Sequence, residues 1–167
     1  MKQLIQSVYD FNLVYARKLV ADLTDEQWAA QPIANGNIMP NHAAWVFGHL
    51  ASTSFSFALP LLNAKPIEKD GWGELFGINS EPCSDASLYL NKASLVGLLE
   101  ESHALVTEAF AKVDEPRLAL PNPAESLRPL FPTIGHMITF VMTSHEATHL
   151  GQLSALRRGL GLPGVFG

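Results

Sequence analysis

The sequence predicts an all-α fold, a bundle of four long helices. Four stretches of about twenty residues carry apolar side chains at three- and four-residue steps, which is the period of an amphipathic helix. Segments rich in proline and glycine separate these stretches, and no run alternates convincingly enough to be a strand. The 167 residues suit one hydrophobic core, so we expect residues 1–167 to form a single domain.

The first helix is expected over residues 2–23. A capping box from Thr24 to Gln27 should follow it and open one short helical turn that ends by Pro32. The predicted buried stripe of the first helix consists of Leu4, Val8, Phe11, Tyr15 and Leu19.

The second helix is expected over residues 42–59, with Asn41 as its N-cap and Pro60 at its end. This stretch contains no Asp, Glu, Lys or Arg, and apolar or small residues nearly encircle it. Such a helix is either buried on all sides or buried on one side and covered by a second copy on the other.

The third helix is expected from Lys92, capped by Asn91, to Val113. The fourth should begin after Thr133 as N-cap and run to Arg158, where Gly159 stops it. Long connections, 60–91 and 114–132, precede these two helices. Connections of this length often cover a functional site.

The composition narrows the class of partner. The formal net charge of -5 gives no field that attracts nucleic acid or anionic membranes, and no apolar run is long enough to cross a bilayer. The single cysteine, Cys83, and the absence of a recognisable signal peptide favour a reducing, cytoplasmic location. The sequence is 47% hydrophobic and only 16% charged, which favours a homodimer that covers part of the surface.

The strongest local motif is His145-Glu146-Ala147-Thr148-His149. On a helix, side chains four residues apart lie on the same face, so the two imidazoles could share one divalent ion. Gln152 lies on that face and could bond a ligand or a metal-bound water. The motif also matches the H-E-x-x-H pattern of zinc proteases, but the 18 residues after His149 (167 − 149) contain no Glu, Asp or His to complete such a site.

A third ligand must therefore lie upstream, and His49 is the best candidate. It lies in the apolar second helix, where a buried imidazole needs a polar partner or a metal. It is also about 12 Å from the helix start, close to the roughly 13 Å that separates His149 from the end of its helix. The two depths match if the helices are antiparallel.

The other histidines are weaker candidates. His136 is about half a helical turn out of phase with the pair, and His103 is expected at the surface or core edge of the third helix. His42 could line a pocket on the face of His49, and Trp45 could be core or could wall a pocket above the ion. Each histidine could equally be an ordinary core residue, which leaves a structural bundle without metal as an alternative.

These residues resemble the DinB/YfiT-like family of metal-dependent four-helix-bundle proteins. The resemblance rests on the segment His-Glu-Ala-Thr-His-Leu-Gly-Gln-Leu, residues 145–153, with Leu156-Arg157-Arg158-Gly159 and Leu162-Pro163 after it. It also rests on the stretch from Asn41 through Trp45 to His49-Leu50. The resemblance implies an up-down-down-up bundle, often dimeric, with metal ligands at His49, His145 and His149.

Some relatives are thiol-dependent transferases or isomerases that use low-molecular-weight thiols, and this implies a comparable activity on a small-molecule substrate. The hypothesis is that a divalent ion presents a thiolate, or alternatively a hydroxide, to an electrophile bound near Trp45. Zinc or nickel is expected, with iron or manganese as alternatives. Glu146 could accept a proton, but its angle from His145 favours a supporting or surface role. The rival functions are a non-catalytic metal-binding or stress-response bundle and a metal-dependent hydrolase.

Overall fold

Four long helical segments form the body of the protein, as predicted. The computed structural model describes residues 1–34 and 36–165. The first segment is α1 (Lys2–Val20) and the third is α6 (Lys92–Lys112). The second and fourth segments each pass through a π-helical turn. The second consists of α3 (Ala43–Thr53), η1 (Ser54–Ala58) and α4 (Leu59–Leu61), and the fourth of α8 (Ile134–Phe140), η4 (Val141–His145) and α9 (Glu146–Gly159).

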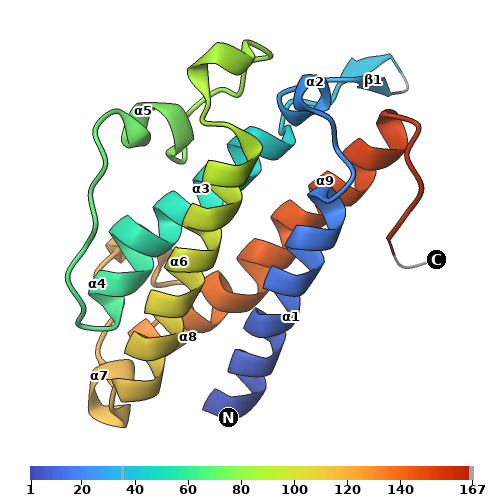
Figure 1. Ribbon diagram of the computed structural model, residues 1–167. Coiled ribbons are helices and arrows are strands. Elements are labelled where there is room, and N and C mark those ends of the chain that lie inside the picture. Colours follow the sequence, from blue (N-terminus) through green and yellow to red (C-terminus); the bar gives the residue numbers. More distant parts are fainter. Residues whose placement is uncertain (35, 166–167) are drawn as a thin grey trace.

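The segments are arranged in up-down-down-up order (Figure 1). α1 and the α8–α9 segment run in one direction, while the α3–α4 segment and α6 run in the opposite direction. Contacts join α1 to α6 and to α9, and join α3 to α6 and to α9. The second and fourth segments are therefore antiparallel neighbours, as matching depths of His49 and His149 require.

Shorter elements occupy the connections. They are α2 (Asp25–Trp28), β1 (Ile33–Ala34), β2 (Asn37–Ile38), α5 (Trp72–Phe76), η2 (Ala86–Leu88), α7 (Glu115–Ala119) and η3 (Glu125–Leu127). β1 and β2 pair antiparallel, so the expectation that no strand forms is wrong for this hairpin. Each strand has only two residues, which is too short to produce a detectable alternation in the sequence.

Three of the four predicted caps are confirmed. Thr24 forms a complete capping box with Gln27, and Asn91 and Thr133 each accept a bond from the first turn of their helices. The fourth prediction, Asn41, is wrong. The ring of His42 caps α3 instead, because its Nδ1 accepts the backbone N–H of Trp45 at 3.2 Å.

The second segment does not end at Pro60, contrary to the prediction. It continues one residue further, to Leu61. The carbonyl of Phe55, which the residue after the π-helical turn would otherwise bond, accepts the backbone N–H of Ile67 at 3.1 Å, so the missing N–H of Pro60 does not leave this acceptor unpaired. The π-helical turn η1 directly precedes α4. Nothing in the apolar pattern of this stretch indicated a π-helical turn.

The predicted buried stripe of α1 is also wrong in part. Leu4, Val8 and Phe11 are 72%, 44% and 52% exposed. α1 carries apolar residues on two sides, and the side that packs against the bundle is not the one that carries Leu4, Val8 and Phe11. The buried residues are Tyr9, Asn12, Ala16, Leu19 and Val20.

α3 is buried on all sides within one chain. Every residue from Ala43 to Ala51 is buried. The sequence left open whether α3 is buried on all sides or covered on one side by a second copy. In the structure, α5 of the same chain packs on α3 from outside the bundle and covers that side. Within residues 1–34 and 36–165, none of the helices combines the length and the apolar composition needed to cross a bilayer.

Candidate metal centre

His49 is held in one orientation by the backbone of α5. It lies in the middle of α3 and is 5% exposed. Its Nδ1 lies 2.7 Å from the carbonyl oxygen of Phe76, and a carbonyl can only accept, so Nδ1 carries the proton. The other nitrogen, Nε2, is then unprotonated and able to bind a cation.

His149 is oriented in the same way by a side chain. Its Nδ1 lies 2.9 Å from Oε1 of Gln152, and that oxygen also accepts a bond of 2.9 Å from the amide of Asn41. Two donors on Oε1 fix the rotamer of Gln152 and leave Nε2 of His149 without a proton. Gln152 was expected either to support the site or to line a pocket and bond a ligand or a metal-bound water; in the structure its amide oxygen bonds His149.

The three imidazoles converge, as the sequence analysis required. One nitrogen from each of His49, His145 and His149 lies within 4.8 Å of the other two. Nε2 of His49 and Nε2 of His145 are 3.1 Å apart. Ligand atoms at typical zinc–nitrogen distances from a tetrahedral ion are separated by about 3.3 Å. The donor set therefore fits a divalent metal ion.

Burial keeps these rings neutral. Desolvation, together with smaller contributions from charge repulsion by His149 and His49, lowers the pKa of His145 to about 3. Desolvation also lowers the pKa of His149 to about 4 and lowers that of His49, whose bond to Phe76 partly offsets the effect. A neutral imidazole is the form that binds metal, so little proton competition opposes binding near pH 7.

The ring of His145 has one unsatisfied nitrogen. Among the described residues, its Nδ1 is buried and has no hydrogen-bond partner, while the ring of Phe140 lies 5.8 Å away. An unpaired buried polar atom costs free energy. A cation bound at the opposite nitrogen, Nε2, would leave Nδ1 unpaired, so the case for a metal rests on the convergence of the three rings.

Trp45 forms one wall of the centre. Its indole is stacked on the ring of His49 with centroids 4.6 Å apart and an interplanar angle of 9°. Its Nε1 donates to Oγ of Ser80 at 2.8 Å, and its ring also lies 5.8 Å from that of His149. Trp45 therefore belongs both to the core and to the surroundings of the histidines.

Two of the expected site residues lie elsewhere. His42 was considered as a pocket residue, but it is fully buried and both ring nitrogens bond backbone groups, those of Trp45 and Cys83. Glu146 was expected to have a supporting or surface role. It is buried, so the surface alternative is wrong, and its Oε1 lies 2.8 Å from Nε2 of His103.

His103 is therefore a core residue and does not lie at the surface or core edge, as the sequence analysis had expected. The ring of Tyr9 is stacked on it at 3.8 Å, and burial raises the pKa of the facing Glu146 carboxyl. His136 is exposed and bonds Thr133, consistent with its predicted orientation away from the pair.

Sequence reasoning missed two groups that shape the centre. The carbonyl of Phe76 acts through the backbone, which leaves no pattern in the sequence. Asn12 donates to the carbonyls of Met142 and Thr143, in the π-helical turn that ends at His145, at 3.5 and 3.3 Å. A polar residue at position 12 in an otherwise apolar stretch was the one signal that could have indicated this contact.

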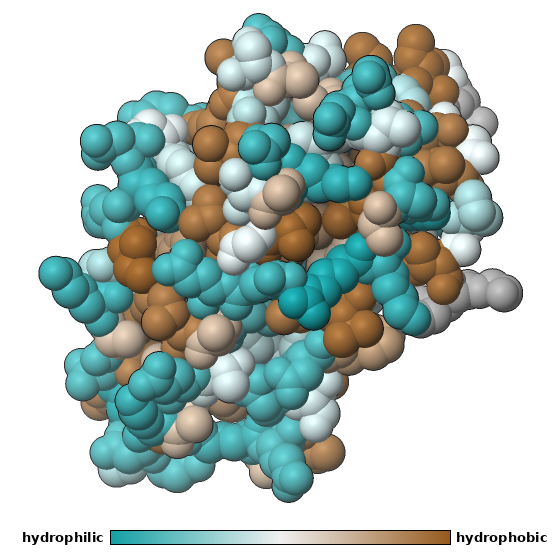
Figure 2. Space-filling model, viewed as in Figure 1, coloured by the Kyte–Doolittle hydropathy of each residue, from teal (hydrophilic) through white to brown (hydrophobic). Residues whose placement is uncertain are grey.

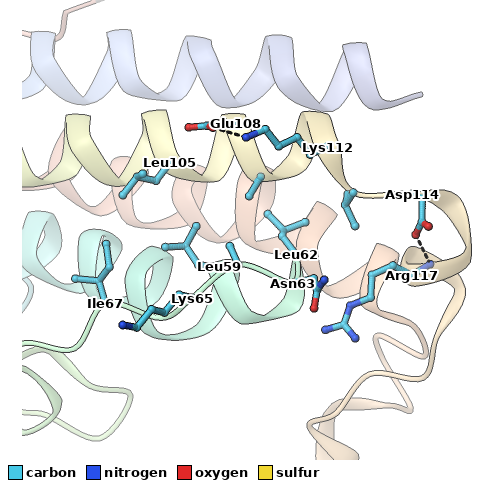
Figure 3. A pocket seen from close by; sticks show the side chains of 13 residues that line it. Leu59, Leu62, Asn63, Lys65, Ile67, Leu105, Glu108, Lys112, Asp114 and Arg117 are labelled. Atoms are coloured by element: carbon cyan, nitrogen blue, oxygen red, sulfur yellow. Dashed lines mark hydrogen bonds and ion pairs between the residues drawn. The ribbon is translucent and has the colours of Figure 1, made fainter.

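A cavity of about 640 Å³ lies away from the histidines (Figure 3). It is bounded by α4, the end of α6 and α7, and none of the three histidines lines it. Arg117 at its edge donates to the carbonyls of Pro60 and Leu61, so its guanidinium joins α7 to the end of α4. The histidine cluster, rather than this cavity, is the place where the described residues assemble reactive groups.

Comparison with known proteins agrees with the four-helix-bundle fold. The structure is similar to that of YfiT from Bacillus subtilis, described as a probable metal-dependent hydrolase with an unusual four-helix bundle topology. The match has a TM-score of 0.64 and 17% identity, and it covers 97% of this chain and 89% of YfiT. No curated protein matches the sequence. A family model matches residues 9–153, the span that contains all three histidines, and by this match the chain belongs to the DinB superfamily.

Proposed function

We propose that this protein is a metal-dependent enzyme in which His49, His145 and His149 hold one divalent ion. The observation that carries the proposal is the convergence of three desolvated, neutral imidazoles, that of His49 buried and the other two partly buried, whose donor nitrogens lie within 4.8 Å of one another. An ion held by three neutral ligands keeps its full double charge and lowers the pKa of a water or thiol bound to it.

The protein supplies orientation and a dry environment. Phe76 and Gln152 fix the proton on the outer nitrogen of His49 and His149, so that the inner nitrogens stay available. The indole of Trp45 excludes water from one side of the histidines and offers an apolar face to a substrate. The described residues closest to the three rings add no carboxylate to neutralise the ion, because Glu146 faces His103.

We infer that the substrate reaction is transfer of a low-molecular-weight thiol to an electrophile, an S-transfer or isomerisation. A soft thiolate is a good partner for zinc or nickel in a site of neutral nitrogens. Hydrolysis is the second candidate, and the structural similarity to YfiT, described as a probable metal-dependent hydrolase, favours it. Both reactions use the same ion, and they differ in the nucleophile, a thiolate or a hydroxide, and in the substrate that it attacks.

Metal content is the first test. Protein purified without an affinity tag should contain about one zinc or nickel ion per chain by elemental analysis, and His149→Ala should lose it while remaining helical. His136→Ala is the matched control, because this histidine is exposed and lies outside the cluster. If wild-type protein neither contains nor takes up zinc or nickel in titration, the proposed centre is wrong.

Activity is the second test. Metal-loaded protein is mixed with a panel of cellular thiols and a reactive electrophile, and separately with ester and amide substrates. Thiol-dependent turnover that His149→Ala abolishes would support S-transfer, and turnover without thiol would support hydrolysis instead. Complete absence of turnover by fully loaded protein would leave a non-catalytic metal-binding bundle.

A further inference from the structure

Gly48 lies beside the candidate ligand His49 and faces the ring of Phe76. A Cβ atom at position 48 would lie 2.1 to 2.4 Å from three carbons of that ring, far closer than atoms can approach. Phe76 is 1% exposed, and the rings of Trp72 and Tyr89 lie 5.0 and 6.0 Å from it. The ring therefore cannot move aside without displacing its neighbours.

The same residue, Phe76, holds the ring of His49 through its backbone. Its carbonyl oxygen lies 2.7 Å from Nδ1 of His49. Ring and carbonyl are joined through one Cα in the last residue of α5. A shift of the ring away from α3 would therefore carry the carbonyl away from His49.

The residues that follow extend this contact to Trp45. Oγ of Ser80 accepts a bond from the indole Nε1 at 2.8 Å and donates to the carbonyl of Gly77, also at 2.8 Å. The segment from Phe76 to Ser80 thus contacts both His49 and the indole stacked on it. This segment belongs to the long connection between the second and third segments of the bundle.

We propose that Gly48 is a positioning residue for the metal centre: the space left by its missing side chain seats the ring of Phe76, and the seated residue fixes the proton and the orientation of His49. This inference rests on the proposed metal site. Partners of the outer nitrogen of a ligating histidine commonly change metal affinity by about 10–100-fold. Alanine is a better helix former than glycine, so any loss in Gly48→Ala would run against helix propensity.

The test compares Gly48→Ala with Gly97→Ala, because Gly97 lies in α6 and a Cβ there meets no atom within 4 Å. Zinc affinity is measured by competition with a chelator. Proton NMR of the cobalt-loaded protein then follows the shifted, exchangeable Nδ1 protons of the histidine ligands. Gly48→Ala should bind zinc at least tenfold more weakly and lose one of these proton signals, while Gly97→Ala should match wild type in both.

A double-mutant cycle separates positioning from general damage. Phe76→Ala removes the ring, and it should weaken zinc binding because the carbonyl loses its anchor. Gly48→Ala added to Phe76→Ala should cause no further loss, since no ring remains to clash. If Gly48→Ala fails to fold, Phe76→Ala alone decides, and wild-type affinity with an unchanged proton signal would overturn the proposal.

The two proposals fail differently. If wild-type protein binds no zinc or cobalt, the metal site itself is wrong. If wild-type protein binds zinc and Gly48→Ala binds it equally well with the same proton signals, only the positioning role is wrong.

Discussion

Desolvated histidines make this protein sensitive to acid at the level of single side chains. The pKa values of His145 and His149 in the folded protein are about 3 and about 4, below the ordinary value of 6.5. Between about pH 4 and pH 6.5, these two histidines are protonated in the unfolded chain and neutral in the folded chain, so the free energy of unfolding decreases as the pH falls. The stabilisation is complete above pH 6.5 and is lost progressively toward pH 4.

We therefore expect metal-free protein to lose stability between pH 7 and pH 5, by about 2 kcal/mol for each histidine that stays neutral when folded. Urea unfolding of chelator-treated protein at several pH values measures this loss. His145→Asn should flatten the pH profile, whereas His136→Asn should not. A wild-type profile without slope in this range would contradict the desolvated, neutral state.

Gln152 provides a second prediction at this scale. Gln152→Leu removes the acceptor for Nδ1 of His149 and leaves that donor unpaired. We expect zinc affinity to fall about 10–100-fold, as for other partners of metal-bound imidazoles. Isothermal titration with zinc measures the change, and Gln3→Leu serves as a control because Gln3 is exposed on α1. Equal affinities for the two variants would show that Gln152 does not support the site.

At the scale of elements, a buried polar contact joins α6 to the start of α9. The carboxylate of Glu146 and the imidazole of His103 are almost completely buried and lie 2.8 Å apart. His103→Leu should lower the free energy of unfolding by about 3 kcal/mol, because it leaves a buried carboxylate without its partner.

The double variant His103→Leu/Glu146→Leu should recover much of that loss, since no polar group then remains unpaired. Chemical denaturation of the metal-free wild type, the two single variants and the double variant gives the four free energies of unfolding that the cycle needs. Strictly additive losses from the two substitutions would mean that the contact contributes nothing of its own.

The sequence predicted these elements unevenly, for physical reasons. A capping side chain bonds a backbone N–H only two or three residues further along the chain. Thr24, Asn91 and Thr133 could therefore be assigned as caps from the sequence. His42 was missed because an imidazole that caps a helix looks the same in sequence as a pocket residue. The two π-helical turns were missed because they depend on tertiary contacts such as those of Asn12 with the turn that ends at His145.

The candidate site was more predictable than its surroundings. The pair His145 and His149 follows from helical spacing alone, and depth along antiparallel helices was enough to select His49. The face of α1 that meets the core was not predictable, because Leu4 and Val8 have the same helical spacing as a true core stripe. Backbone groups such as the carbonyl of Phe76 carry no residue-specific signal at all.

At the scale of the whole molecule, α1 presents an exposed apolar stripe at the surface. Leu4, Val8 and Phe11 follow at steps of four and three residues, the spacing of a helix–helix seam, and all three are exposed. Figure 2 shows hydrophobic residues exposed among hydrophilic ones on the face that carries α1 and α6. We propose that a second copy of the chain covers this stripe in a homodimer.

Sedimentation at micromolar concentration should then give a dimer for wild type. Val8→Lys/Phe11→Lys should give a monomer with unchanged helix content, because two charges in the seam oppose association. Ile33→Lys is the control, since this residue is 70% exposed but lies in the hairpin. A monomeric wild type would contradict the proposal.

The π-helical turn η4 accommodates one residue more than an α-helical turn would. On an uninterrupted α-helix, the residues that α8 buries and those that α9 buries would face directions about 100° apart. The additional residue cancels this rotation, so both sets meet the same core. These residues are Ile134, Met137 and Ile138 before the turn and Leu150, Leu153 and Leu156 after it.

The rotation of α9 relative to α8 is therefore set by the number of residues in the turn between them as well as by which residues are apolar. Deleting Thr143 would keep every histidine and almost every core residue, yet it would rotate α8 against α9 by one residue step. If α8 kept its packing in the bundle, α9 would be rotated about its axis and His149 would point away from His49. The convergence of the three imidazoles at the proposed metal centre therefore depends on the number of residues between α8 and α9 as well as on the histidines themselves.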